Sequence, residues 1–256
     1  MRIVGSVGYL RDRARKRGSR ALFLFIAGIV IVAASFVAAQ APGASALLSG
    51  FPAFVGFGSI LLGVLQASAA RRDADAAGAE GPLLTQLRAR LSDDYLYLHR
   101  VTLPGQNTEA EAVLLGPHGA LVLGVHARPG TYTVRGDDWF EGTSPAEGGE
   151  ALRESPSWRL ARPLRALQRI AREEGFIELP VNGAVVLARG ELAGAERPSV
   201  AVVPVSRIAS YVEYLKAEDA EVLREPVQLL AEMLTPLAAG GRAERGAKGA
   251  DGNAAA

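Results

Sequence analysis

Two residues with ionisable side chains stand at the ends of a pair of short apolar segments. Glu111 precedes the segment 112–115, and His126 follows the segment 120–125. The sequence Gly-Pro-His-Gly at 116–119 separates the two segments, and apolar segments on both sides of a Gly/Pro turn predict a β-hairpin. A carboxylate can bind a divalent cation, and an imidazole can transfer a proton. The hairpin therefore makes Glu111 and His126 candidates for a residual catalytic site, with Glu111 as the candidate metal ligand. The alternative is a hairpin whose ends are only solvated.

This hairpin resembles the core of the nuclease-related domain (NERD), a branch of the PD-(D/E)xK nuclease-like proteins. The family pattern has an acid, a few apolar residues, Gly-Pro-x-Gly, a second apolar segment and then Glu-x-Lys. Glu111 matches the acid and residues 116–119 match the turn, whereas Gly124 and His126 stand at the Glu and Lys positions. The family's first-helix Glu falls on Pro82. The resemblance implies a restriction-endonuclease-like αβββαβ core with a mixed sheet and degenerate active-site positions.

The missing acids limit the metal chemistry that the resemblance implies. A nuclease of this type holds Mg²⁺ or Mn²⁺ on carboxylates, and the cation activates a water molecule. Glu111 alone predicts a weak site, and the mostly neutral ring of His126 replaces the charge of a lysine poorly near pH 7. We therefore expect no cofactor, or Mg²⁺ or Mn²⁺ if nuclease activity remains. A divergent nuclease could also use Glu80 or Glu109, although Glu80 is expected to point away from the site.

The other two histidines predict no site. His118 lies in the hairpin turn, where we expect an exposed side chain. His99 lies in a predicted strand at 95–103, beside Tyr95 and Tyr97, and no partner cluster for a metal is visible near it in the sequence. We therefore expect His99 on a half-buried face of the sheet.

A helix predicted over residues 160–174 offers a candidate surface for nucleic acid. Its apolar residues recur at helical spacing, and Pro163 is expected in its first turn. Basic side chains fall on the opposite face, where they could contact phosphate groups, although surface helices often carry charges without any ligand. These residues are Arg159, Arg162, Arg165, Arg169 and Arg172.

The N-terminal quarter of the chain predicts an integral membrane segment. Residues 1–20 form a basic arm, and the segments 21–39 and 46–67 contain no charged residue. Each segment is long enough to span a bilayer core of ~30 Å. Basic residues flank the pair on its outer sides only, which predicts a transmembrane hairpin over 21–67 at the inner membrane, with both termini and the soluble part in the cytoplasm. A cleaved signal peptide is the alternative for the first segment.

The remaining chain divides into a predicted linker at 68–81, an α/β domain similar to NERD at 82–239, and a disordered tail at 240–256 without periodicity. The absence of cysteine excludes disulfides, thiolate nucleophiles and cysteine-based metal sites. Seven basic residues and one acidic residue in the arm 1–20 give it a charge of +6, so the rest of the chain carries −5 of the total +1. A net-acidic body predicts weak non-specific binding to nucleic acid.

These features favour a membrane-anchored protein similar to NERD that has lost catalysis. It would bind nucleic acid or a protein partner at the cytoplasmic face of the membrane. Two alternatives stay open at this point. One is a divergent metal-dependent nuclease that acts on DNA. The other is a membrane structural or interaction protein, working as a homo-oligomer without a role in nucleic-acid binding.

Overall fold

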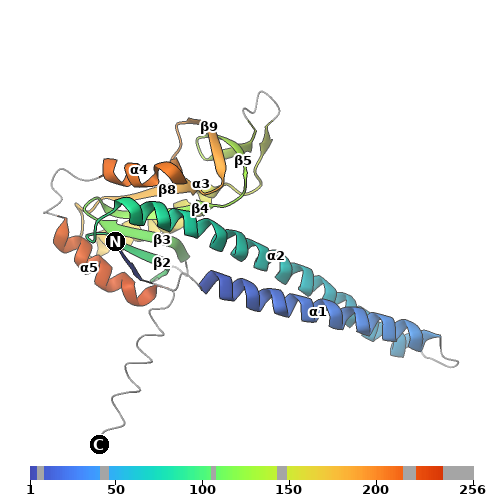
Figure 1. Ribbon diagram of the computed structural model, residues 1–256. Coiled ribbons are helices and arrows are strands. Elements are labelled where there is room, and N and C mark those ends of the chain that lie inside the picture. Colours follow the sequence, from blue (N-terminus) through green and yellow to red (C-terminus); the bar gives the residue numbers. More distant parts are fainter. Residues whose placement is uncertain (5–8, 41–45, 105–107, 143–148, 216–222, 239–256) are drawn as a thin grey trace, which may run out of the picture. The chain divides into compact units, whose positions relative to one another are not determined.

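The computed structural model describes residues 1–4, 9–40, 46–104, 108–142, 149–215 and 223–238 (Figure 1). The predicted tail at 240–256 lies outside these ranges. Contacts divide the chain into two compact units. One unit comprises residues 10–77, and the other comprises residues 1–9 together with 78–256.

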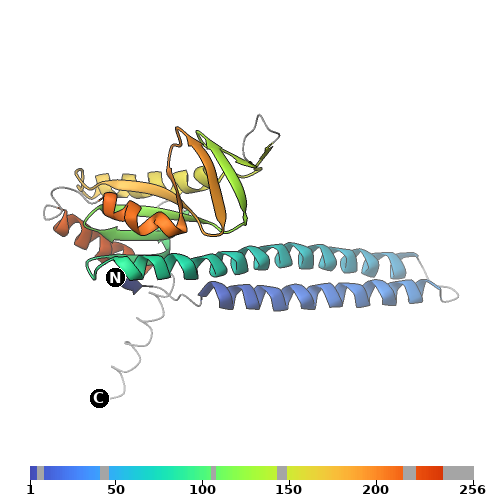
Figure 2. The same cartoon turned by 45° about the horizontal axis from the view of Figure 1, so that its top comes forward.

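The unit 10–77 consists of two apolar helices that pack side by side (Figure 2). They are α1 (Tyr9–Ala39) and the first part of α2 (Ala46–Arg90). Glycine permits their close approach, because a Cβ atom added at Gly28 would lie 2.7 Å from the carbonyl oxygen of Gly56. The segments Ala14–Val37 and Pro52–Arg71 are long and apolar enough to cross a membrane. The two apolar helices expected from the sequence are therefore present.

The expected linker at 68–81 is helical instead. Helix α2 continues without a break through this segment and past Pro82 to Arg90. Alanine supplies much of the segment and has the highest helix propensity of all residues, so its composition favours continuation of the helix.

The unit formed by residues 1–9 and 78–256 is built on a six-stranded mixed sheet with the order β1-β2-β3-β4-β8-β10. Strands β2, β3 and β4 pair antiparallel, while β8 pairs parallel to β4 and to β10. With the end of α2 before β2 and with α3 (Pro156–Glu173) before β8, the order of elements confirms the expected αβββαβ core. The strands are β1 (Arg2–Val4), β2 (Leu96–Leu103), β3 (Thr108–Gly116), β4 (Gly119–His126), β8 (Val181–Leu187) and β10 (Ala201–Pro204).

The basic arm 1–20 begins with a strand that the sequence did not predict. Residues Arg2, Ile3 and Val4 pair in parallel with the first residues of β2, so the arm begins as an edge strand. Three residues are too few to show a strand period, and their partners lie more than ninety positions later in the chain. Local pattern therefore could not reveal this strand.

A smaller four-stranded sheet, with the order β7-β6-β5-β9, follows the hairpin. Its strands are β5 (Gly130–Arg135), β6 (Asp138–Glu141), β7 (Glu150–Ala151) and β9 (Gly190–Glu196). Strand β9 was not expected, because its sequence, Gly-Glu-Leu-Ala-Gly-Ala-Glu, lacks the β-branched and aromatic residues typical of strands. Its pairing with β5 supplies the main-chain hydrogen bonds that hold it extended.

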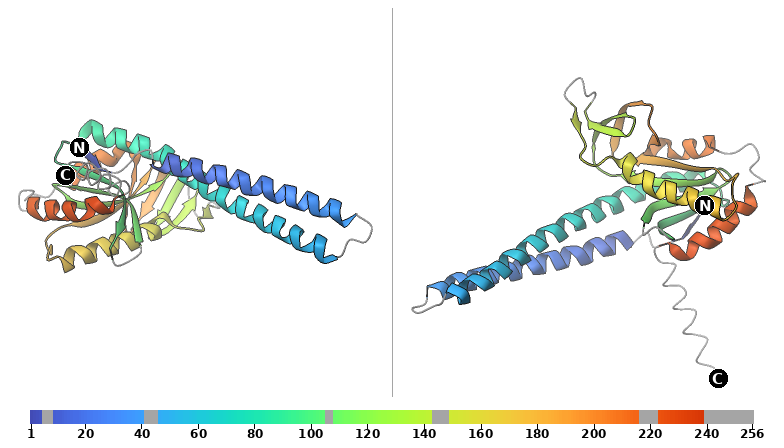
Figure 3. Two further views of the ribbon diagram at one scale, coloured as in Figure 1. Left: turned by 90° about the horizontal axis from the view of Figure 1, so that it is seen from below. Right: turned by 180° about the vertical axis from the view of Figure 1, so that it is seen from behind.

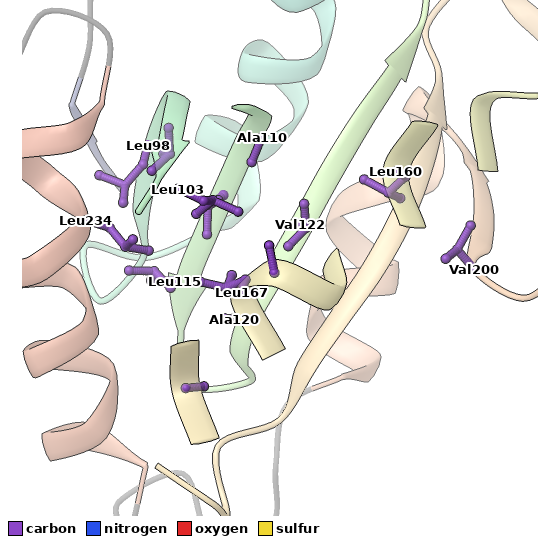
Figure 4. Packing of buried hydrophobic residues seen from close by; sticks show 14 of the residues in the cluster. Leu98, Leu103, Ala110, Leu115, Ala120, Val122, Leu160, Leu167, Val200 and Leu234 are labelled. Atoms are coloured by element: carbon purple, nitrogen blue, oxygen red, sulfur yellow. The ribbon is translucent and has the colours of Figure 1, made fainter. Parts of the chain in front are cut away.

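Helices cover both faces of the six-stranded sheet (Figure 3). Helices α3 and α5 (Arg224–Leu234) pack on one face, where Leu160, Leu167 and Leu234 meet strand residues such as Val122 (Figure 4). The last turns of α2 and the short helix α4 (Ile208–Tyr214) contribute to a second core on the other face. Two 3₁₀ turns, η2 (Val205–Arg207) and η3 (Thr235–Leu237), precede α4 and follow α5.

Candidate functional site

The acid of the predicted site lies where the pairing of the hairpin ends. The predicted hairpin is present, and its ladder runs from the turn as far as the pair Ala112–Leu123. Beyond this pair, a side-chain hydrogen bond takes the place of main-chain pairing. The Oε2 of Glu111 accepts this hydrogen bond, 2.7 Å long, from the main-chain N–H of Val125. Glu111 therefore joins β3 to β4 at the point where main-chain pairing stops.

The neighbouring strand β2 is irregular at the same level. Arg100 has a φ of 48°, a left-handed conformation that is uncommon for a residue other than glycine. The regular pairs His99–Ala112 and Val101–Ala110 lie on either side of it. Beyond Arg100, Val101 joins the core under α3 and α5, whereas His99 lies buried against α2. The left-handed residue thus interrupts the alternation of faces beside Glu111.

A pocket with a volume of about 340 Å³ opens at this irregular end of the strands. Its charged lining residues are three arginines and two glutamates, so the formal balance is positive. The arginines are Arg100, Arg159 and Arg162, and the glutamates are Glu109 and Glu111. The remaining lining residues are Thr108, Leu123, Gly124, Val125, Pro156, Leu160 and Pro163.

Arginine side chains neutralise both carboxylates of the pocket. The guanidinium of Arg159 lies 2.5 Å from Oε1 of Glu111, and the Nε of Arg100 contacts Glu109. Arg162 makes no ion pair with any residue in the described part of the chain. The pocket therefore holds one arginine whose charge is not balanced by a neighbouring acid, and two more whose acids could be exchanged for another anion.

The first two turns of α3 position the arginines from this helix. Ser155 caps the helix by accepting a hydrogen bond from the N–H of Trp158, and Pro156 occupies the first turn, where a missing N–H costs little. The helix therefore begins earlier than the sequence predicted, and Pro163 lies inside it and not in its first turn. The predicted apolar face is buried, as shown by Leu160, Leu167 and Ile170.

The structure gives Glu111 arginine neighbours in the pocket, and it does not place His126 in the pocket lining. The ring of His126 packs edge-on against Tyr132, with centroids 4.7 Å apart, and against Trp139 at 5.6 Å. Burial, followed by the positive charges of Arg128 and Arg159, lowers the pKa of His126 from 6.5 to about 4. His126 is therefore an uncharged ring in an aromatic cluster at neutral pH.

The residues present do not fit the Mg²⁺ or Mn²⁺ ion of an active nuclease-like site. Such ions need several oxygen ligands, and the oxygens of Glu111 already accept from Val125 and Arg159. Gly124 offers no side chain, although a Cβ atom there would stand 3.5 Å from Leu160 and would find room. No three Asp, Glu or His side chains in the described ranges are grouped so that they could hold one ion.

A buried pair of titratable residues, Glu80 and His99, lies on the other face of the sheet. Both residues are only 3% exposed, and Glu80 Oε1 lies 3.2 Å from His99 Nε2. Burial, partly offset by Arg100, raises the pKa of Glu80 from 4.5 to about 7, and burial with the charge of Arg100 lowers the pKa of His99 to about 4. Because both shifts favour the uncharged forms, we treat this contact as a neutral pair and not as a salt bridge.

Glu80 points away from the pocket, as expected, and His99 is more deeply buried than the half-buried face predicted for it. One signal in the sequence indicates the burial of Glu80. Glu80 lies three and four positions before Leu83 and Leu84, so it continues the apolar stripe of the helix onto the buried face. The expectation for His118 was wrong. It is fully buried and stacks on Tyr95, with ring centroids 5.7 Å apart, and burial lowers its pKa to about 4.

The predicted basic face of α3 is exposed in the structure. Two of its arginines fold back along the helix, because the Nε atoms of Arg165 and Arg172 donate to the carbonyl oxygens of Ala161 and Gln168. The exposed arginines are Arg159, Arg162, Arg165, Arg169 and Arg172.

Comparison with curated proteins finds no match, and neither does comparison with solved structures. A comparison with family models does find one. The matched region begins in α2, ends one residue after β8, and contains every residue that lines the pocket. Residues 77–188 match the family model of the nuclease-related domain (NERD), and this region includes strands β2, β3, β4 and β8 and the whole pocket.

Proposed function

We propose that this protein is a membrane-anchored, nuclease-related protein that binds nucleic acid and does not cleave it at the arginine-lined pocket. The observation that carries the proposal is the contact of Arg159 with Glu111, the one carboxylate retained from the family pattern. A guanidinium stands where a nuclease would bring a metal ion to its acid. A fixed positive charge attracts phosphate, but it cannot lower the pKa of a bound water as a metal ion does.

The surrounding charges support phosphate as the ligand. Arg100, Arg159 and Arg162 present guanidinium groups to one pocket, and guanidinium binds phosphate oxygens in a bidentate manner. Exposed arginines continue from the pocket along α3, as Arg165, Arg169 and Arg172 show. A line of arginines that leads into a pocket is suited to follow a phosphate backbone. A single small anion would leave the arginines on the helix unused.

The connection between the two units supports a membrane hairpin. Strand β1, which precedes α1, pairs with β2, which follows α2. If both apolar segments span a bilayer, this pairing requires that the chain enter and leave on the same side, as two spans do. Removal of residues 1–39 as a signal peptide would also remove an edge strand of the sheet. These points favour a two-span anchor, with the nuclease-related domain on the side to which the positive-inside rule assigns the basic arm.

The substitution Glu111→Gln tests the proposal against the nuclease alternative, because it should strengthen binding under the proposal and abolish cleavage under the alternative. We expect Glu111→Gln to strengthen binding of nucleic acid, because it frees Arg159 from a competing charge. Two unit charges about 4 Å apart in a water-like medium interact by about 1 kcal/mol, which corresponds to roughly fivefold in affinity. Fluorescence anisotropy of a labelled oligonucleotide, with the full chain in detergent and with EDTA present, measures this change.

Arginine substitutions complete the test. The double variant Arg159→Gln with Arg162→Gln is expected to weaken binding and to lower the slope of log K against log salt by about 0.7 to 0.9 for each phosphate group that the variant no longer neutralises. Arg207→Gln is the matched control, because Arg207 is exposed and lies outside the pocket and α3. Cleavage by the wild type with Mg²⁺ or Mn²⁺, abolished by Glu111→Gln, would overturn the proposal in favour of a divergent nuclease.

A further inference from the structure

Trp158 is an exposed tryptophan beside the pocket. Its side chain is 61% exposed, whereas tryptophan is among the most buried residue types on average. The second tryptophan of the chain, Trp139, shows the usual behaviour, because it is 1% exposed and its Nε1 donates to Ser157 Oγ at 2.8 Å. A large apolar ring in solvent lowers solubility without stabilising the fold, so we consider the exposed ring of Trp158 as a binding surface for a ligand.

The ring belongs to the same helical face as the arginines. Trp158 lies in the first turn of α3, and Arg162 and Arg165 follow at spacings of four and seven residues. At 3.6 residues per turn these spacings place the three side chains in one line along the helix. Arg162 also lines the pocket, so it connects Trp158 to the cluster of arginines. An aromatic ring, a basic line and a basic pocket thus adjoin one another on one surface.

Building on the function proposed above, we propose that this surface binds single-stranded nucleic acid. Trp158 stacks on one base, the adjacent phosphate enters the pocket of Arg100, Arg159 and Arg162, and the backbone continues along α3 toward Arg165. Stacking on a protein side chain requires a base whose face is open, which a single strand offers and an intact duplex does not. Arginines alone would bind both forms through their phosphates.

Trp158 itself reports on the contact. Since Trp139 is shielded, a ligand that stacks on a tryptophan should quench the fluorescence of Trp158 only. We expect single-stranded oligonucleotide to quench the emission of the full chain in detergent, and we expect the variant Trp158→Phe to lose that quenching. Double-stranded oligonucleotide of the same sequence should quench little. Equal quenching of the wild type and of Trp158→Phe would overturn the assignment.

The affinities of Trp158 and arginine variants for single-stranded and double-stranded nucleic acid test base stacking separately from the proposed function on which it rests. Trp158→Ala should weaken binding of single strands roughly 5- to 150-fold, the usual range for one base stacked on an aromatic ring, and should leave duplex binding unchanged. Trp158→Phe should keep most of the affinity. If Trp158→Ala has no effect while Arg159→Gln with Arg162→Gln weakens binding, the stacking is refuted and the proposed function stands. If neither form of nucleic acid binds, both are refuted.

A lipid surface is the competing occupant, because tryptophan and arginine also gather at membrane interfaces. The full chain reconstituted in vesicles that contain brominated anionic lipid distinguishes the two. We expect the bromine to leave Trp158 emission unquenched, as judged from the difference between wild type and Trp158→Phe. Strong quenching by brominated lipid, relieved in Trp158→Phe, would assign the surface to the membrane and overturn the inference.

Discussion

The buried carboxyl of Glu80 predicts a change in stability with pH that one substitution can isolate. Its folded pKa of about 7 lies above the usual 4.5 because burial penalises the charged form. As pH rises from 4.5 to 7, the unfolded chain loses the proton of Glu80 while the folded chain keeps it. The folded state is therefore destabilised over this window, and the loss is complete above pH 7.

The substitution Glu80→Gln removes this titration and keeps the shape of the side chain. A pKa raised from 4.5 to about 7 corresponds to at most about 3 kcal/mol, and relaxation around the charged form reduces the effect to about 2 kcal/mol. We expect the variant to match the wild type near pH 4.5 and to exceed it at pH 8. For a domain of this size the gain in melting temperature is roughly 4–8 °C.

Thermal unfolding of the full chain in detergent between pH 4.5 and 8 measures the difference. His99 titrates in the opposite direction, because its folded pKa of about 4 lies below 6.5 and its neutral form stabilises the fold as pH rises. Because Glu80→Gln changes the direct neighbour of His99, the two proteins are compared above pH 6.5, where His99 is neutral in both the folded and the unfolded chain. Glu178→Gln is the control, since Glu178 is exposed. A difference between Glu80→Gln and wild type that does not vary with pH would refute the buried, protonated carboxyl.

Two further predictions concern the hairpin. Gly119 has a φ of +91°, and an added Cβ would lie 2.4 Å from the carbonyl oxygen of Pro180. Gly119→Ala should therefore lower the free energy of unfolding, measured by urea denaturation, by about 2 kcal/mol or more. Gly124→Ala should change it by less than about 0.5 kcal/mol, because a Cβ there meets no close contact. His118 has a folded pKa of about 4 and takes up a proton on unfolding below pH 6.5, so it destabilises the fold as pH falls from 6.5 toward 4. His118→Phe should flatten this part of the stability profile, and an unchanged acid limb would contradict the burial of a neutral ring.

Local sequence patterns were sufficient where a feature depends on neighbours in the chain. The apolar segments around the Gly-Pro-His-Gly turn predicted β3 and β4, and the leucine and arginine periodicity predicted α3 with its exposed basic face. Features that depend on distant partners were missed. Strand β1 needs β2 to hold it, and the burial of His118 needs Tyr95 to stack on it.

The candidate site shows the same limit. Glu111 could be chosen from the hairpin pattern, but its neighbour Arg159 lies 48 positions away on a helix whose start the sequence placed too late. Arg100 lines the pocket because its own main chain adopts a left-handed conformation inside strand β2. No apolar pattern in the sequence indicates that conformation. Spacing can thus place an acid at the end of a strand. It cannot say which charge faces that acid.

The charge of the side chain that faces Glu111 decides the proposed chemistry. A nuclease-like site with two acids is negative and must recruit a cation before phosphate can approach. In the resemblance to the family, Gly124 falls where the second acid is expected, and Arg159 lies beside Glu111. Under the proposed function, the exchange of one carboxylate for one guanidinium changes the formal charge of the site by two units and favours an anion over a cation. On this reasoning Gly124→Asp combined with Arg159→Ala should create binding of Mn²⁺ to the full chain, measurable by calorimetry. Absence of binding at millimolar Mn²⁺ would show that more than charge balance separates the two kinds of site.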